Sequence, residues 1–243
     1  MECWDRFDRK TVLYFTGNKD TRVPGMEKEL KRVGLDGSDR QWQFPSPIDR
    51  CLLRGMAHEP VLEKGGFFNA TMGHYRAIAT AYHLGCGNVL LMEDDIRFLK
   101  DAGLVSEIVS SLPGDYDIAM FDLFPVSWKD TWRNHAAVKK WAAEKKVNDH
   151  WAHFDEMYSG GCYALSRKAM KKMLFLFEAV ETDKRIGKFR VCDHFLKRKY
   201  FWPDAKMYFA RKNACVQRSV GNSGSLNGTY VAMGVDFSEY AEA

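Results

Sequence analysis

The apolar run at residues 88–92, NVLLM, constrains the fold of this chain more than any other segment. Its apolar residues do not alternate with polar ones, which is typical of a strand that is covered on both faces. Strands of this kind belong to α/β sheets with parallel members. Three carboxylates, Glu93, Asp94 and Asp95, follow the run directly. The sequence therefore predicts a buried strand that ends in an acidic cluster.

The neighbouring segments alternate between strand and helix patterns. β-Branched and aromatic runs predict strands at residues 11–15, 40–44 and 116–124. Apolar residues at helical spacing predict helices at 24–34, opened by a proline, and at 69–86. This order predicts an α/β fold with a mixed, mainly parallel sheet flanked by helices. Such sheets bind ligands in a crevice beyond the carboxyl ends of their strands, so we expect the acidic cluster to face that crevice.

The second half of the chain is less regular. Gly160 and Gly161 allow close approach of the backbone to a ligand, or simply make a turn. A short strand and a helix follow, and Ser166 is placed to cap that helix. A further short helix is expected at 188–201, and the Gly-, Ser- and Asn-rich stretch 216–234 indicates a mobile loop or lid.

Composition limits the class of partner. At 243 residues the chain suits a single domain, 1–243. Its formal net charge of +4 is too small to indicate a nucleic acid as partner. Basic residues gather after position 138, which suits a nucleotide or an anionic membrane surface.

The same survey bears on location. No segment approaches the roughly 18 consecutive apolar residues of a membrane-spanning helix, and the N-terminus lacks the apolar core of a signal peptide. Six scattered cysteines without a CxxC pair indicate reduced thiols. We therefore expect a cytoplasmic protein, with peripheral contact to a membrane left open.

The acidic cluster itself predicts a divalent cation. Neighbouring carboxylates repel one another and need a counter-charge at a buried edge. Hard cations such as Mn²⁺ or Mg²⁺ prefer oxygen ligands, and Mg²⁺ is usually shared with a diphosphate. Glu93 and Asp95 are two residues apart and point the same way from an extended chain. The alternative is a solvated acidic turn in which an Asp caps the next helix.

Six segments in order resemble glycosyltransferase family 25, the lipooligosaccharide and collagen galactosyltransferase group. NVLLMEDDI resembles the LEDD strand end of that family, and SGGCYALSRKAMKKML its Gly-x-x-Tyr-x-x-Ser-Arg-x-x-Ala helix entry. NATMGHYRAI is similar to its Gly-Cys-x-x-Ser-His segment, with His74 on the histidine. LYFTGNKDTRVPGMEKELKRVGL, RVCDHFL and CVQRSVGNSGS resemble its opening strand and helix, its Pro-Val-Asp segment and its closing Gln…Ser stretch. The matches span about residues 11–225.

The chain departs from the family pattern at three places. Asn69 and Ala70 replace the Gly-Cys pair, and Gly73 replaces the serine before the histidine. Phe15 and Thr16 stand where the family has Asn-Leu after the first strand. In the family, these positions lie where the protein recognises the sugar and the nucleobase of the donor. The departures therefore bear on the identity of the donor more than on the reaction class.

The resemblance implies a GT-A fold and a metal-dependent, inverting transfer of a hexose from a UDP-sugar, with UDP-galactose or UDP-glucose as the default donor. The acceptor would be a glycan hydroxyl, as in lipopolysaccharide or other surface-glycan synthesis, on a membrane-anchored or free glycan. Asp95, with help from Glu93 or Asp94, would hold the metal ion beside the donor diphosphate. Asp193 falls on the family's aspartate and is the candidate base that deprotonates the acceptor; the alternative is a helix N-cap. Asp122, an acid at a strand end, is a weaker candidate.

Residues beside the cluster have two interpretations each. Thr16 and Gly17 follow the first strand, where a base or ribose would lie, although a plain turn needs the same residues. Arg22 suits a phosphate or an exposed surface position. His74 suits contact with donor or acceptor, or a bond to nearby backbone. The polar stretch 128–154 contains four tryptophans, of which one or two would suit a sugar-stacking surface: Trp128, Trp132, Trp141 and Trp151.

Two other functions stay open from the sequence. The departures at Asn69 and Gly73 suit a protein that binds a nucleotide-sugar or carbohydrate without catalysis. A metal-dependent nucleotidyltransferase or phosphatase also uses acids at strand ends, but it would not need the later motifs. Release of UDP from UDP-sugars without an acceptor separates an enzyme from an inactive binding protein.

Overall fold

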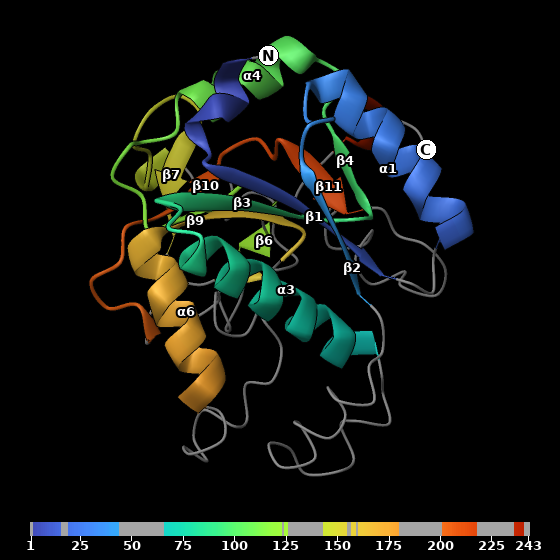
Figure 1. Cartoon of the computed structure of the whole chain (residues 1–243). Coiled ribbons are helices and arrows are strands. Elements are labelled where there is room, and N and C mark those ends of the chain that lie inside the picture. The colour runs from blue at the N-terminus through green and yellow to red at the C-terminus, as the bar shows by residue number, and fades with distance from the viewer. Residues whose placement is uncertain are drawn as a thin grey trace.

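The computed structural model describes residues 2–15, 19–43, 66–122, 124–125, 143–154, 157–158, 160–179, 201–217 and 236–240. A seven-stranded sheet lies at its centre, with helices on both faces (Figure 1). Within the described residues, no helix has the length and apolar character needed to cross a membrane.

The sheet is mixed and mainly parallel. Its strands, in spatial order, are β2 (Asp39–Gln43), β1 (Arg9–Phe15), β3 (Asn88–Glu93), β9 (Cys162–Ser166), β5 (Ile118–Met120), β10 (Met207–Ala210) and β7 (Trp151–His153). The pairs β1–β2, β1–β3 and β5–β10 are parallel. β9 is antiparallel to both of its neighbours, β3 and β5, and β7 is antiparallel to β10. The predicted fold class, an α/β fold with a mainly parallel sheet flanked by helices, is confirmed.

Two apolar cores cover the two faces of the sheet. Helices α1 (Lys19–Val33) and α4 (Ala102–Ser110) contribute buried residues to one core, and α3 (Gly66–His83) and α6 (Arg167–Ala179) to the other. Figure 1 shows α3 and α6 side by side on one face, across the sheet from α1 and α4. The central strand β3 is buried from Val89 to Met92, which explains its unbroken apolar sequence.

Shorter elements complete the described part of the chain. Two small antiparallel ladders join β4 (Ile96–Phe98) to β11 (Cys215–Gln217), and β6 (Phe124–Pro125) to β8 (Met157–Tyr158). The 3₁₀ helices η1 and η6 span Glu2–Arg6 and Phe237–Glu239. The β4–β11 ladder brings Gln217 beside the acidic end of β3.

Two predictions about helix starts have different outcomes. Ser166 caps α6 as predicted, since its hydroxyl accepts a hydrogen bond from the Ala169 backbone N–H at 3.2 Å. Pro24 does not open α1, which begins earlier, at Lys19. The extra turn contains Arg22, whose guanidinium pairs with Asp94, and this tertiary contact outweighs the proline's local preference.

The alternative interpretation of the acidic cluster, a solvated turn that caps the next helix, is wrong on both points. Asp94 and Asp95 form a tight turn into β4, not into a helix, and Asp94 is only 1% exposed. The cap of α4 is Asp101, whose side chain accepts a hydrogen bond from the Leu104 backbone N–H at 3.0 Å.

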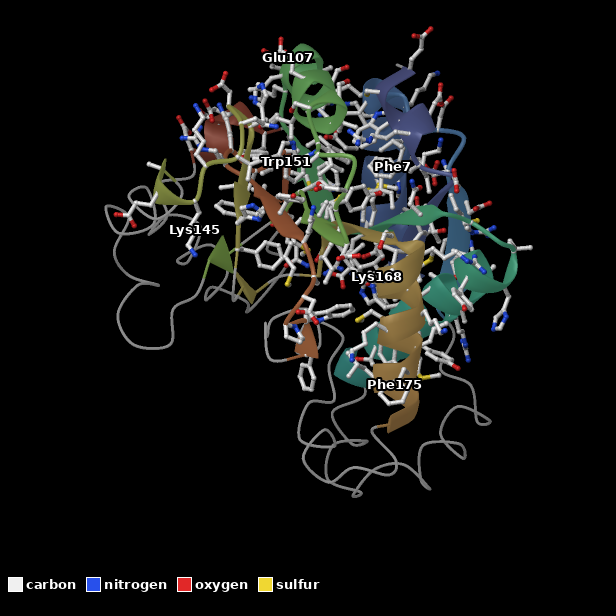
Figure 2. The ribbon with its side chains drawn as sticks, turned by 90° about the vertical axis from the view of Figure 1, so that its left-hand side faces the viewer. Phe7, Glu107, Lys145, Trp151, Lys168 and Phe175 are labelled. Atoms are coloured by element: carbon white, nitrogen blue, oxygen red, sulfur yellow. The ribbon has the colours of Figure 1, made fainter. Side chains whose placement is uncertain are left out.

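Trp151 belongs to the core and offers no surface to a sugar. Its side chain is 0% exposed and its indole N–H donates to the Ile108 carbonyl at 2.8 Å, beneath α4 (Figure 2). The other three tryptophans of that polar stretch lie outside the described residues, as do nearly all of the predicted helix at 188–201 and of the loop or lid at 216–234.

Candidate functional site

The acidic cluster lies where parallel strands present their carboxyl ends. Glu93 is the last residue of β3, and the register places it opposite Leu13 of β1. Because β1, β2 and β3 are parallel, their carboxyl ends meet at one edge of the sheet. That edge is where α/β sheets bind ligands.

Asp94 fastens the end of β1 to the end of β3. Its two oxygens accept hydrogen bonds from the Phe15 backbone N–H and from Arg22 Nη1, both at 3.0 Å. Burial raises the pKa of the Asp94 carboxyl, and the bonds from Phe15 and Arg22 offset only part of that effect. Both oxygens of Asp94 therefore have protein donors, one at the end of β1 and one on α1.

Asp95 has the least satisfied carboxylate of the three. Its Oδ2 lies 3.4 Å from Arg22 Nη1, while its buried Oδ1 has no hydrogen-bond partner among the described residues. Burial raises the pKa of Asp95 well above its ordinary range, and the neighbouring charge of Glu93 raises it further. Arg22 opposes this shift only in part. Among the described residues, Arg22 is the cation that faces this carboxylate, and it does not offset the burial and the charge of Glu93.

Glu93 is held from two sides. Its Oε1 lies 3.0 Å from His74 Nε2, and its Oε2 accepts a hydrogen bond from Gln217 Nε2 at 2.7 Å. Its backbone N–H donates to the Gly161 carbonyl at 2.7 Å. Behind it, the second nitrogen of His74 lies 2.9 Å from the Tyr163 hydroxyl. A chain of polar contacts therefore links α3, β9 and β11 to the end of β3.

Asp122 is the fourth acid of this neighbourhood. It follows β5 and is 0% exposed, and its charge contributes to the raised pKa of Asp95. It lies close to the backbone of Gly161: a Cβ at that position would come within 2.5 Å of Asp122 Oδ2 and 2.7 Å of Gln217 Cγ. The glycine therefore allows Asp122 and Gln217 to approach one backbone position closely.

We expect Gly161→Ala to destabilise the protein by about 1–3 kcal/mol, because the new methyl group must displace Asp122 or Gln217 in a packed site. Urea unfolding followed by circular dichroism measures the change. Gly37→Ala is the matched control, since its Cβ would meet nothing within 4 Å. It should leave stability unchanged or slightly raised. Equal effects of the two substitutions would contradict the close packing described here.

The structure brings together four of the predicted site residues: Arg22, Glu93, Asp94 and Asp95. His74 joins them through Glu93. Thr16, Gly17 and Asp193 lie outside the described residues. Within the described part of the chain, no group of three or more His, Cys, Asp or Glu side chains is placed to hold a metal ion. Metal binding by Asp95 and Glu93 therefore stays a prediction.

Sequence reasoning did not assign site roles to Tyr163 and Gln217. Both residues lie in segments that resemble family motifs, the first in the Gly-x-x-Tyr entry and the second in the Gln…Ser stretch. Position within a motif was the available signal. The motifs could not predict that β9 pairs with β3 and β11 with β4, and these pairings bring both side chains to Glu93.

Comparison with known proteins gives distant structural likenesses. No family model matches the chain, and a search of curated proteins returns no match. One similar structure is a glycosyltransferase involved in the glycosylation of the major capsid of PBCV-1, with a TM-score of 0.49, 10% identity and coverage of 93% of this chain and 100% of that one.

Two further likenesses are weaker. One is to a UDP-glucose pyrophosphorylase complexed with UDP-glucose, with a TM-score of 0.42, 11% identity and coverage of 93% and 97% of the two chains. The other is to the mannose-1-phosphate geranyltransferase of Thermus thermophilus, with a TM-score of 0.41, 11% identity and coverage of 86% and 74%. Likenesses of this degree assign neither a family nor an activity.

Proposed function

We propose that the protein is a metal-dependent, inverting glycosyltransferase of the GT-A type that moves a hexose, galactose or glucose, from a UDP-sugar to a glycan hydroxyl. The observation that carries the proposal is the buried Oδ1 of Asp95, which has no hydrogen-bond partner among the described residues and lies among other carboxylates. The ordered resemblance to family 25 supports the reaction class.

The Asp95 carboxylate suits a hard divalent cation. Asp95 Oδ1 has no hydrogen-bond donor among the described residues, and Mn²⁺ and Mg²⁺ favour oxygen ligands. Glu93, the second proposed ligand, already takes one hydrogen bond on each oxygen. When bound, the ion would stabilise the charge that develops on the leaving diphosphate.

Other residues are proposed to bind the donor phosphate and nucleoside and to deprotonate the acceptor. Arg22 already pairs with Asp94 and Asp95, and its buried Nε has no hydrogen-bond partner among the described residues, so it is proposed to face a donor phosphate. Thr16 and Gly17 are proposed to contact the nucleoside. Asp193 is proposed to take the proton from the acceptor hydroxyl in line with the leaving group, as a single inverting displacement requires.

The biological setting belongs to the same proposal. A glycan acceptor of the lipopolysaccharide or surface-glycan type would be presented at a membrane. A cytoplasmic enzyme would then meet it at the membrane surface. The basic residues after position 138 support such contact, because anionic headgroups attract them.

A screen of nucleotide-sugars tests the activity. We expect UDP release from UDP-galactose or UDP-glucose in the presence of Mn²⁺, with little release after EDTA treatment. GDP-mannose provides the control for nucleobase selectivity. Absence of UDP release from every UDP-sugar, with and without oligosaccharide acceptors, would contradict the proposal.

A catalytically inactive binding protein is the second candidate. The observation that favours it is the engagement of Asp94 and Glu93 by protein donors, which leaves Asp95 as the least occupied acid. Calorimetry separates the two functions when combined with the release assay. Tight Mn²⁺-dependent UDP-sugar binding without any UDP release would favour the binding protein.

A further inference from the structure

Four polar side chains from four different elements form one continuous chain of contacts. The Tyr163 hydroxyl on β9 lies 2.9 Å from His74 Nδ1, and His74 Nε2 on α3 lies 3.0 Å from Glu93 Oε1. Gln217 on β11 donates to Glu93 Oε2 at 2.7 Å. The rings of His74 and Tyr163 also stack, with centroids 5.6 Å apart. The chain of contacts ends on a single carboxylate at the strand end.

His74 is enclosed within this network. It is 1% exposed and Tyr163 is 0% exposed. Both ring nitrogens of His74 lie within hydrogen-bond distance of protein atoms, one at each neighbour. A residue in this position affects a ligand through Glu93 instead of touching it.

When Glu93 is ionised, the donor and the acceptor of each hydrogen bond in this network are determined. An ionised carboxylate only accepts hydrogen bonds, so His74 Nε2 must carry a proton and donate it to Oε1. In neutral His74, Nδ1 is then an acceptor, and the Tyr163 hydroxyl donates to it. Tyr163 thereby fixes the tautomer and the ring orientation of His74, and His74 fixes Glu93.

Glu93 retains capacity for further donors. An ionised carboxylate accepts about four hydrogen bonds, and two are supplied by His74 and Gln217. Its side chain is 16% exposed, at the edge of the sheet where ligands bind. The positive ends of two N–H dipoles already face its oxygens, which makes them poorer cation ligands than Asp95 Oδ1. A neutral hydroxyl group is a donor that suits the remaining acceptor positions of the Glu93 carboxylate.

We propose that Tyr163 and His74 are positioning residues that hold the Glu93 carboxylate to accept a hydrogen bond from a hydroxyl of the transferred sugar. The proposal rests on the proposed function and replaces one part of it: Glu93 contacts the sugar and is not a ligand of the metal ion, which is left to Asp95. We call the contacts from Tyr163 through His74 to Glu93 the relay. Loss of the relay should weaken binding of the whole UDP-sugar without weakening binding of UDP.

Calorimetry with Tyr163→Phe tests this, using UDP-galactose, UDP-glucose and UDP as probes, each with Mn²⁺. The substitution removes one hydroxyl and keeps the stacked ring. We expect the Kd of the preferred UDP-sugar to rise about 5- to 20-fold, as for a weakened hydrogen bond to a charged group, while the Kd of UDP stays within about 2-fold. His74→Phe should give a larger change of the same kind. Because His74→Phe removes both bonds of a buried ring, Tyr163→Phe carries the test if that variant does not fold.

Tyr240→Phe is the matched control. It also removes a buried tyrosine hydroxyl, one that donates to the Asn213 carbonyl at 2.9 Å, but it lies outside the relay. Both Kd values should stay unchanged in this variant. A selective effect of Tyr163→Phe, absent from Tyr240→Phe, is the signature that a general loss of stability would not produce.

A double-mutant cycle with Glu93→Gln completes the test. If Tyr163 acts through Glu93, adding Tyr163→Phe to Glu93→Gln should cause little further loss of UDP-sugar affinity. Equal losses for UDP and the UDP-sugar, no loss for either, or fully additive losses would each overturn the positioning role. A wild-type protein that binds neither UDP nor either UDP-sugar would instead overturn the proposed function, and this inference with it.

Discussion

Asp95→Asn is expected to abolish Mn²⁺-dependent binding of the UDP-sugar and to lower transfer on the order of 10²- to 10³-fold. The substitution keeps the size of the side chain and removes the charge that would hold the ion, whose contribution to such reactions is several kcal/mol. Calorimetry with and without Mn²⁺ measures the binding, and UDP release measures the rate.

Asp101→Asn is the matched control for this substitution. It removes the same charge from the N-cap of α4, where Asn caps as well as Asp, so donor binding and stability should both hold. An Asp95→Asn variant that keeps Mn²⁺-dependent affinity for UDP-sugars would show that the ion is held elsewhere.

The stability of Asp95→Asn should change in the opposite direction to its activity. Burial raises the pKa of Asp95 above its value in the unfolded chain, so ionisation of this carboxyl opposes folding. That penalty is fully present above the folded pKa and disappears as the pH falls to the unfolded value. In EDTA, the variant should therefore be more stable than the wild type at about pH 8, and the difference should shrink towards about pH 5. A difference in the free energy of unfolding that does not vary with pH would contradict the raised pKa.

Asp193→Asn is expected to lower transfer by about 10²- to 10⁴-fold, the usual contribution of a general base. Asn preserves the shape of the side chain but cannot take the proton of the acceptor hydroxyl. Binding of the UDP-sugar should barely change, because the base acts on the acceptor. Steady-state transfer rates and calorimetry of the same variant give the two readings.

Asp122→Asn provides the comparison for that experiment. If Asp193 only caps a helix, its Asn variant should transfer at the wild-type rate, since Asn is an equally good cap. A large loss in Asp122→Asn combined with a normal Asp193→Asn would give the role of base to Asp122. Asp122 is fully buried and close to Gly161, so its variant also needs a measurement of stability.

The sequence predicted the elements whose patterns are local. The unbroken apolar run of β3 was enough to predict a strand that is covered on both faces. Ser166 was enough to predict the start of α6. Local chemistry decides such features, since capping and strand burial depend on a few neighbouring residues.

Features that depend on distant pairing could not be predicted. β4 is a three-residue strand whose partner, β11, lies more than a hundred positions later in the chain. The start of α1 before Pro24 depends on the pairing of Arg22 with Asp94 and Asp95. His74 was expected at a ligand or near backbone, but its partners Glu93 and Tyr163 come from two separate strands. Contacts between segments that are distant in the sequence determine these features, so the residue pattern of one segment cannot predict them.

The place of β9 in the sheet has a consequence for synthesis. β9 lies between β3 and β5 in the sheet but follows both in the chain. During translation, β3 and β5 therefore lack this shared neighbour until β9 has been synthesised. Pairings that span so much of the chain form slowly, and unpaired strand edges attract other chains meanwhile. Glu93 would acquire its last partner only when Gln217 leaves the ribosome. Under the proposed function, the nascent chain should therefore bind the whole UDP-sugar only late in synthesis, after Gln217 has joined Glu93, so UDP-sugar binding would report completed folding.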